Sequence, residues 1–175
     1  MNSFMLIKKA ILGLSLVIIA TSSCKIPKSY IQTQNGSDQI LNGSVQKDVL
    51  FDAKTFPWFN YGYKTYEMDT LTLSQIKHQA DSLQILAIGG TWCADTQKEL
   101  PRFLKICNFL KIKNERIELM MVDEKKQCAF FNVKVINLIS VPTFIVLKNG
   151  KEIGRIVESP EESLEKHLVK IIGLH

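Results

Sequence analysis

Apolar positions change their spacing several times along the chain, and each change predicts a different element. The nearly continuous apolar run from Leu83 to Gly89 predicts a buried strand. From Cys93 to about Lys111 the apolar residues recur at helical spacing around Pro101, so we expect a helix that this proline bends. Residues 117–122 predict the next strand.

The last third of the chain predicts a hairpin and a closing helix. Residues 143–147 and 152–157 read as strands joined through Lys148-Asn149-Gly150. Ser159 and Pro160 form a helix start, with serine as the cap and proline at the first position.

Two less regular segments are also expected to be helical. One is capped by Asp69 or Thr70 and runs to about Ala80, and the other covers Ala129 to about Val135. After a first helix, the predicted order is therefore β-α-β-α-β-β-α.

The N-terminal segment has the composition of an export signal. Lys8 and Lys9 precede an apolar run that is too short for a comfortable membrane span, and small polar residues then lead to Cys24. A cysteine in this place resembles a lipoprotein signal, of the loose kind found in Bacteroidota-like bacteria. We therefore expect residues 1–23 to be removed and Cys24 to carry lipid. The protein would then face the periplasm from either membrane of a bacterial cell envelope; the alternative is an uncleaved anchor or an ordinary signal peptide.

The next segments divide by composition. Residues 24–48 are rich in Ser, Gln, Asn and Gly with little apolar periodicity, which predicts a flexible tether. Residues 49–175 are expected to form one folded domain. Its aromatic-rich start, residues 49–63, favours an extension that packs on the sheet over a recognition surface.

Charge argues against a nucleic-acid partner. Once Lys8 and Lys9 are removed, the 22 basic residues fall to 20 against 17 acidic ones, a net charge of +3. The charge is small and scattered, so no nucleic acid is expected. The three histidines lie far from Cys93 in sequence, and neither a metal site nor a Cys-His pair is expected.

The candidate chemistry centres on Cys93, which follows the strand at 83–89 and opens the next helix. Unpaired backbone N–H groups and the positive end of the helix dipole favour an anion at this position. A cysteine placed there is stabilised as the thiolate, the form that attacks disulfides.

These residues carry a resemblance to a known family. Trp92-Cys93 at a strand-to-helix turn, Pro101 eight residues after the cysteine, and Val141-Pro142-Thr143 far downstream resemble the thioredoxin superfamily over roughly residues 50–175. The resemblance implies an α/β fold with a central mixed β-sheet flanked by helices. It also implies that a cis Pro142 faces the cysteine, that the backbone at Val141 pairs with an extended substrate, and that Trp92 helps these two residues to position that substrate. Its partners would be protein or small-molecule thiols and disulfides, without a cofactor, and we expect a monomer.

Two positions depart from the dithiol members of that family. Thr96 stands where they have a second cysteine, and Ala87 stands where thioredoxins carry a buried aspartate. The Thr96 hydroxyl can donate a hydrogen bond to the Cys93 thiolate but cannot resolve a mixed disulfide, and Asp95 opposes the thiolate. The chain therefore resembles a monothiol variant.

The other cysteines outside the signal are Cys107 and Cys128. Along a helix, Cys107 lies about 21 Å from Cys93, too far for a disulfide, and we expect a buried core thiol. Cys128 is expected to be structural, with a resolving or regulatory thiol as the alternative.

Three functions fit these residues. The first is a thiol-disulfide oxidoreductase, isomerase-like or reductase-like, that acts through Cys93 alone, with another thiol completing the exchange. The second is a non-catalytic binding module of the envelope that uses the Pro142 edge. The third is a thiol peroxidase, suggested by the Cys-x-x-Thr spacing, although Trp58 and Trp92 do not fit its later motifs.

Overall fold

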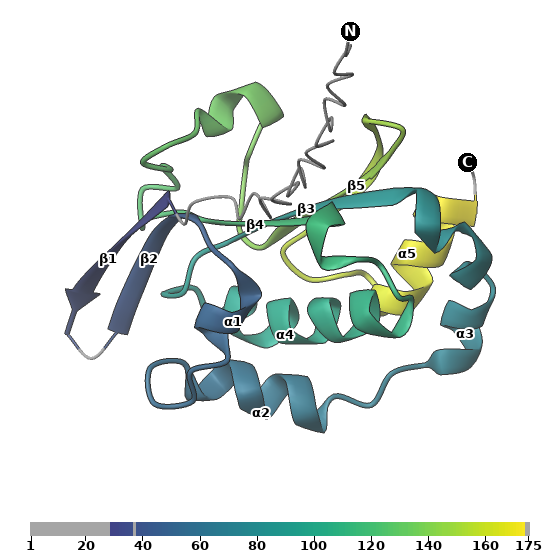
Figure 1. The fold of residues 1–175 in the computed structure, drawn as a ribbon, viewed down its shortest axis with the longest axis horizontal. Helices are drawn as coiled ribbons and strands as arrows, with labels where there is room; N and C mark the ends of the chain where they lie inside the picture. Colours follow the sequence, from purple (N-terminus) through teal and green to yellow (C-terminus); the bar gives the residue numbers. More distant parts are fainter. Residues whose placement is uncertain (1–28, 37, 174–175) are drawn as a thin grey trace, which may run out of the picture.

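A six-stranded mixed sheet in the order β1-β2-β4-β3-β5-β6 forms the centre of the computed structural model, which describes residues 29–36 and 38–173. The helices α4 and α5 lie along one face of the sheet, and α2 packs on the side of α4 away from it (Figure 1). This arrangement confirms the predicted thioredoxin-like α/β fold. The predicted signal peptide and Cys24 fall outside the described residues.

The elements in chain order are β1 (Ser29–Asn35), β2 (Asp38–Ser44), α1 (Lys47–Leu50), α2 (Pro57–Thr65), α3 (Thr70–Ser74), the 3-10 helix η1 (Lys77–Ser82), β3 (Leu83–Gly89), α4 (Ala94–Phe109), η2 (Asn114–Arg116), β4 (Ile117–Met121), η3 (Val133–Ile136), β5 (Thr143–Lys148), β6 (Lys151–Val157) and α5 (Leu164–Gly173). Within the described range, no helix is both long enough and apolar enough to cross a membrane.

The pairing of the central strand β3 brings the ends of three strands together. It runs parallel to β4, with Gly89 opposite Met121, and antiparallel to β5, with Ile88 opposite Thr143. The C-terminal ends of β3 and β4 therefore meet the N-terminal end of β5 at one edge of the sheet. The residues that follow β3 must therefore lie beside the residues that precede β5.

The prediction of a flexible tether over residues 24–48 is wrong for residues 29–35 and 38–44. These form an antiparallel hairpin whose second strand joins the sheet where Gly43 pairs with Met121. Gly43 has a φ of +129°, and a Cβ there would lie 2.1 Å from the Ser29 carbonyl oxygen. The buried Leu41 shows that this polar segment contributes to the core.

The aromatic-rich start of the domain packs mainly on helix α4, which corrects the expectation that it covers the sheet. Phe56 and Phe59 are buried. Gly62 permits a close approach, because a Cβ there would lie 2.7 Å from the Pro101 Cγ inside α4.

Two predicted helices differ from the structure. The segment 129–135 begins in a tight turn closed by a β-bridge between Cys128 and Phe131, and only its end enters η3. The predicted helix over residues 70–80 divides into α3, whose Asp69 side chain caps it as expected, and η1.

The closing helix begins later than predicted. Ser163, not Ser159, accepts a hydrogen bond from the Lys166 N–H at 3.2 Å, and α5 starts at Leu164. Its first turn therefore follows Pro160 by several residues.

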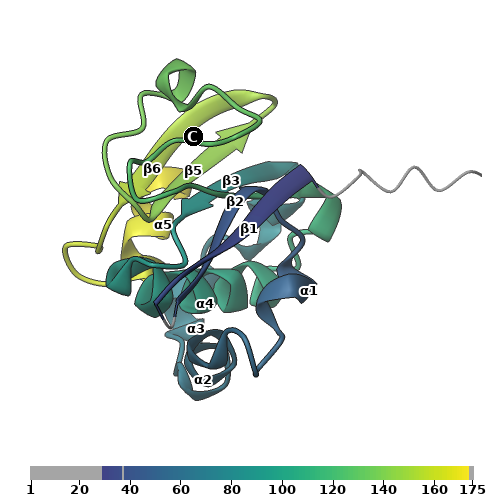
Figure 2. The ribbon, with the colours of Figure 1, turned by 90° about the vertical axis from the view of Figure 1, so that its left-hand side faces the viewer.

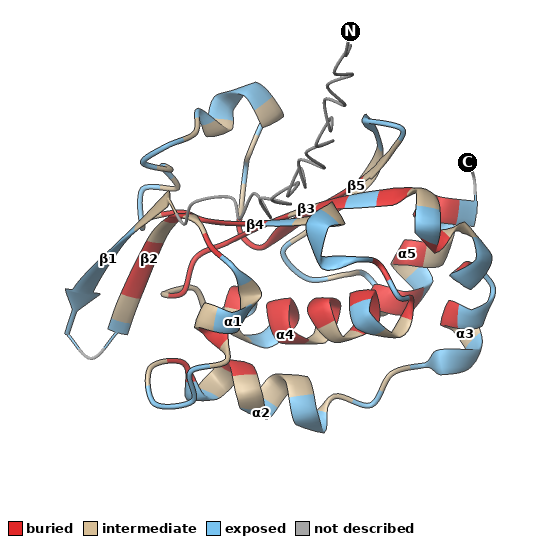
Figure 3. Ribbon diagram, in the orientation of Figure 1, coloured by how far each residue is buried: buried red, intermediate tan, exposed pale blue. Residues whose placement is uncertain are grey.

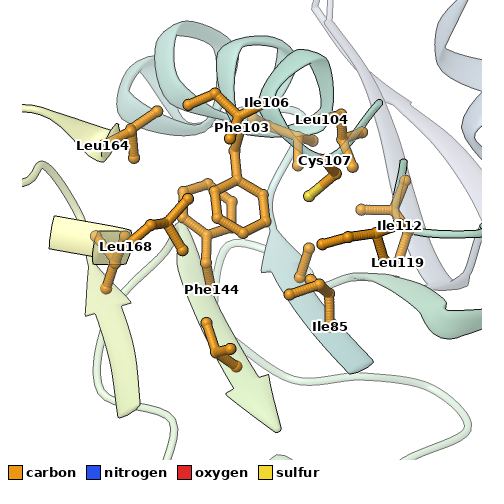
Figure 4. Close-up of a cluster of buried hydrophobic side chains, with 14 of the residues drawn as sticks. Ile85, Phe103, Leu104, Ile106, Cys107, Ile112, Leu119, Phe144, Leu164 and Leu168 are labelled. Atoms are coloured by element: carbon orange, nitrogen blue, oxygen red, sulfur yellow. The ribbon is translucent and has the colours of Figure 1, made fainter. Parts of the chain in front are cut away.

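The main core lies between the sheet and helices α4 and α5, where the buried residues gather (Figure 3). Phe103 of α4 stacks on Phe144 of β5, with the ring centroids 4.0 Å apart and the planes 2° from parallel. Cys107 points into the same cluster (Figure 4), and its burial raises the pKa of this thiol to about 12. The prediction that Cys107 is a core thiol is confirmed.

We expect Phe103→Ala to lower the free energy of unfolding by about 3–5 kcal/mol, because it removes a buried ring and leaves a cavity. Leu71→Ala is the control, since Leu71 is 81% exposed. That variant should stay within about 0.5 kcal/mol of the parent. Urea unfolding of both variants measures the difference, and similar midpoints would contradict the core assignment.

Candidate active-site turn

The turn between β3 and α4 presents Cys93 as the residue that precedes the first turn of the helix. Its N–H donates to the Gly90 carbonyl at 2.9 Å, and its own carbonyl accepts from the Gln97 N–H at 2.9 Å. Its backbone is extended, with φ −89° and ψ 123°, and its side chain caps no helical N–H. The thiol therefore stays available at a helix N-terminus and is half-buried.

The Val141–Pro142 peptide bond is cis and lies beside this thiol. The Cys93 Sγ is 3.3 Å from the Val141 carbonyl oxygen, within range for S–H donation. The Pro142 carbonyl in turn accepts from the Glu158 N–H at 2.7 Å, which ties the proline to the end of β6. The structure thus brings together residues that lie 48 positions apart in the chain.

Trp92 fastens the turn to β4. Its indole Nε1 donates to the Val122 carbonyl at 3.0 Å. The ring is half-buried and packs, together with Cys93, against a small apolar cluster. We call this the second cluster; its buried members are Ile88, Met120, Val122, Val141 and Ile145.

Thr91 fastens the same turn to β2, a contact that the sequence did not reveal. Its hydroxyl donates to the Gln39 carbonyl at 2.7 Å and accepts from the Leu41 N–H at 3.2 Å. The Gln97 Nε2 donates a hydrogen bond to the Thr91 carbonyl at 2.8 Å. The hairpin at residues 29–44 is therefore a support of the cysteine turn.

Thr96 has a different place from the one predicted. Its side chain is fully buried, and its hydroxyl oxygen accepts from the Gly90 N–H at 3.2 Å. The hydrogen bonds of the described residues do not include one from Thr96 to Cys93. The Cys93 thiol is hydrogen-bonded to the Val141 carbonyl oxygen instead. Thr96 thus braces the turn from inside.

Ala87, which stands where the resemblance to thioredoxins implies a buried aspartate, brings no carboxylate to the turn. This residue is fully buried in the main core on β3. Asp95, in the first turn of α4, is exposed. It complements the helix dipole and at the same time places a negative charge near the sulfur.

The described residues contain no group of side chains that could bind a metal ion. Among residues 29–36 and 38–173, no three His, Cys, Asp or Glu side chains lie close enough together to hold a metal ion.

Comparisons with known proteins point to one family. A thioredoxin family model matches residues 58–170. Thioredoxin H2 of Arabidopsis thaliana is 28% identical over 101 residues, which cover 58% of this chain and 71% of that protein. A thioredoxin-like protein of Acanthamoeba polyphaga mimivirus is 28% identical over 98 residues, 53% of this chain and 64% of that protein.

Solved structures show the same fold. A protein of unknown function from Pseudomonas aeruginosa superposes with a TM-score of 0.51 at 15% identity, covering 76% of this chain and 91% of the other. This likeness concerns the fold alone, whereas the family model spans more than half of the sequence, including the Cys93 turn and the Val141–Pro142 bond. The chain belongs to the thioredoxin family.

Proposed function

We propose that this protein is a thiol-disulfide oxidoreductase of the bacterial cell envelope, with Cys93 as its nucleophile. The observation that carries the proposal is the position of the Cys93 sulfur, which lies at the N-terminus of α4 and 3.3 Å from the carbonyl that precedes the cis proline. A helix N-terminus favours a thiolate. The neighbouring backbone gives a place for an incoming chain.

The reaction begins with attack of the Cys93 thiolate on one sulfur of a substrate disulfide. The S–S bond of the substrate breaks, a Cys93–substrate disulfide forms, and the other substrate sulfur leaves as a thiolate. A second thiolate then attacks the Cys93 sulfur or the substrate sulfur of this mixed disulfide. Thr96 cannot supply it, because a hydroxyl does not exchange with disulfides.

The Val141–Pro142 backbone beside the thiol would orient the substrate. An extended peptide lying along this backbone would bring its disulfide to the Cys93 sulfur, as in strand addition at a sheet edge. Partners of this kind are protein or small-molecule disulfides, and the reaction needs no bound cofactor.

The envelope location rests on the N-terminal sequence. A basic start, a short apolar run and Cys24 after small residues support export followed by lipid attachment. The hairpin that begins at Ser29 leaves few residues between such a lipid and the folded part. The domain would therefore sit close to the membrane surface.

We expect Cys93→Ser to abolish formation of a mixed disulfide with glutathione, because the serine oxygen does not exchange with the glutathione disulfide. The full chain carrying Cys24→Ser, purified in detergent, is incubated with glutathione disulfide and mapped by peptide mass. Cys107→Ser is the matched control and should behave as the parent, since that thiol is buried. A parent that binds extended peptides while Cys93 remains a free thiol throughout the incubation would instead support the binding-module alternative.

Thr96→Cys should give the turn a dithiol and raise its activity as a reductant of glutathione disulfide. The substituted position lies three residues after Cys93, the spacing of dithiol family members. Peptide mapping should find a disulfide between position 96 and Cys93 after oxidation. The double variant Cys93→Ser/Thr96→Cys should lack it, and a folded single variant without this disulfide would contradict the turn geometry.

Cys24→Ser should prevent lipid attachment in a bacterial host that processes lipoproteins. Metabolic labelling with a radioactive fatty acid should label the parent and the Cys107→Ser control, and the Cys24→Ser label should fall to background. Equal labelling of both Cys24→Ser and parent would overturn the lipid assignment without touching the chemistry of Cys93.

A further inference from the structure

A second half-buried thiol, Cys128, packs against the same apolar cluster as Cys93. Both cysteines and Trp92 are among the half-buried side chains that contact the second cluster, while Cys107 belongs to the main core on the other side of the sheet. Cys128 has no disulfide partner among the described residues. Two free thiols therefore face one small cluster from different segments.

The segments that carry the two cysteines are both held at the end of β4. The Trp92 indole donates to the Val122 carbonyl at 3.0 Å. The next residue, Asp123, donates its N–H to the Gln127 carbonyl at 3.0 Å, which closes a turn. Cys93 follows Trp92 and Cys128 follows Gln127 in the chain, so both cysteines lie next to residues that are held at this strand end.

The segment that carries Cys128 is irregular and lies outside the strand ladders of β4 and β5. Residues 123–142 rise from the sheet face opposite α4 (Figure 2) and contain only turns, one β-bridge and η3. Its large apolar side chains divide into two groups. Phe130, Val135 and Ile139 are 59%, 67% and 75% exposed, whereas the others pack against the second cluster: Phe131, Val133, Ile136 and Leu138. Because the segment takes no part in those ladders, its local opening would let Cys128 move over the cluster while the pairing of β4 and β5 with β3 stays intact.

The third thiol of the described residues, Cys107, is not available for exchange with Cys93. Cys107 is 1% exposed and belongs to the main core as a residue of helix α4. Its deprotonation is disfavoured by burial, which raises its pKa to about 12.

We propose that Cys128 is the resolving thiol of this protein, an assignment that rests on the proposed function of Cys93. The Cys128 thiolate attacks the Cys93 sulfur of the mixed disulfide. A Cys93–Cys128 disulfide forms, the bond from Cys93 to the substrate breaks, and the substrate sulfur leaves as a thiolate. The substrate is reduced by two electrons and the protein is oxidised by two, and a low-molecular-weight thiol such as glutathione restores the dithiol.

The experiment uses the full chain with Cys24→Ser in detergent, so that three cysteines remain. The reduced protein is mixed with glutathione disulfide, quenched in acid at intervals and mapped by peptide mass. In the parent we expect a transient glutathione adduct on Cys93 that is replaced by a Cys93–Cys128 disulfide. The rate of this replacement should not change on dilution, because the step is intramolecular.

Cys128→Ser should keep the adduct on Cys93 and lose the internal disulfide, whereas Cys107→Ser should behave as the parent. Cys128→Ala serves as a second variant, and circular dichroism checks that each variant is folded. A parent that keeps glutathione on Cys93, with Cys128 reduced or separately glutathionylated, would overturn the role of Cys128 and leave the proposed function standing. A Cys128→Ser variant that never acquires glutathione on Cys93 would overturn both.

Discussion

The pairing of β3 with a parallel neighbour on one side and an antiparallel neighbour on the other is the constraint on which the site depends. Because β3 ends where β4 ends and where β5 begins, the chain after β3 has to turn beside Val122 and beside Val141–Pro142. The turn then uses both neighbours, through the Trp92 indole and the Cys93 sulfur. A slip of one residue in either register would exchange the inward and outward faces of β3 and separate these contacts.

Two positions near Cys93, Thr96 and Ala87, have structural roles and do not take part in the exchange. Thr96 is fully buried, and its hydroxyl satisfies the Gly90 N–H, so this position serves the turn rather than the substrate. Ala87 likewise serves the core of the sheet, where a carboxylate would need a partner. Since neither position can complete an exchange, the proposed reaction needs a second thiol, either from another molecule or from a part of this chain outside α4. The residues that follow β4 are placed beside the turn by the register itself.

Sequence patterns predicted those parts of the fold that local physics decides. The apolar run at 83–89 and the helical spacing after Cys93 match β3 and α4 closely, because both elements are buried along a regular period. The hairpin at 29–44 was missed, since β1 is largely exposed and its polar composition is that of a tether. Its place depends on pairing with β4, some 80 residues away in the chain. The residues of the site could be selected from sequence, but Thr91 could not, because its partners lie on that unexpected hairpin.

The two faces of the sheet divide stability from reactivity. Beneath α4 and α5 the main core is deep, and Phe103 and Phe144 stack within it. The opposite face has only the small second cluster, covered by an irregular segment with exposed apolar side chains. Cys93 lies between the two, on a helix fixed by the deep core and with its sulfur turned to the shallow cluster. Local opening of the shallow side can therefore expose this sulfur to a disulfide while the ladders around β3 stay intact.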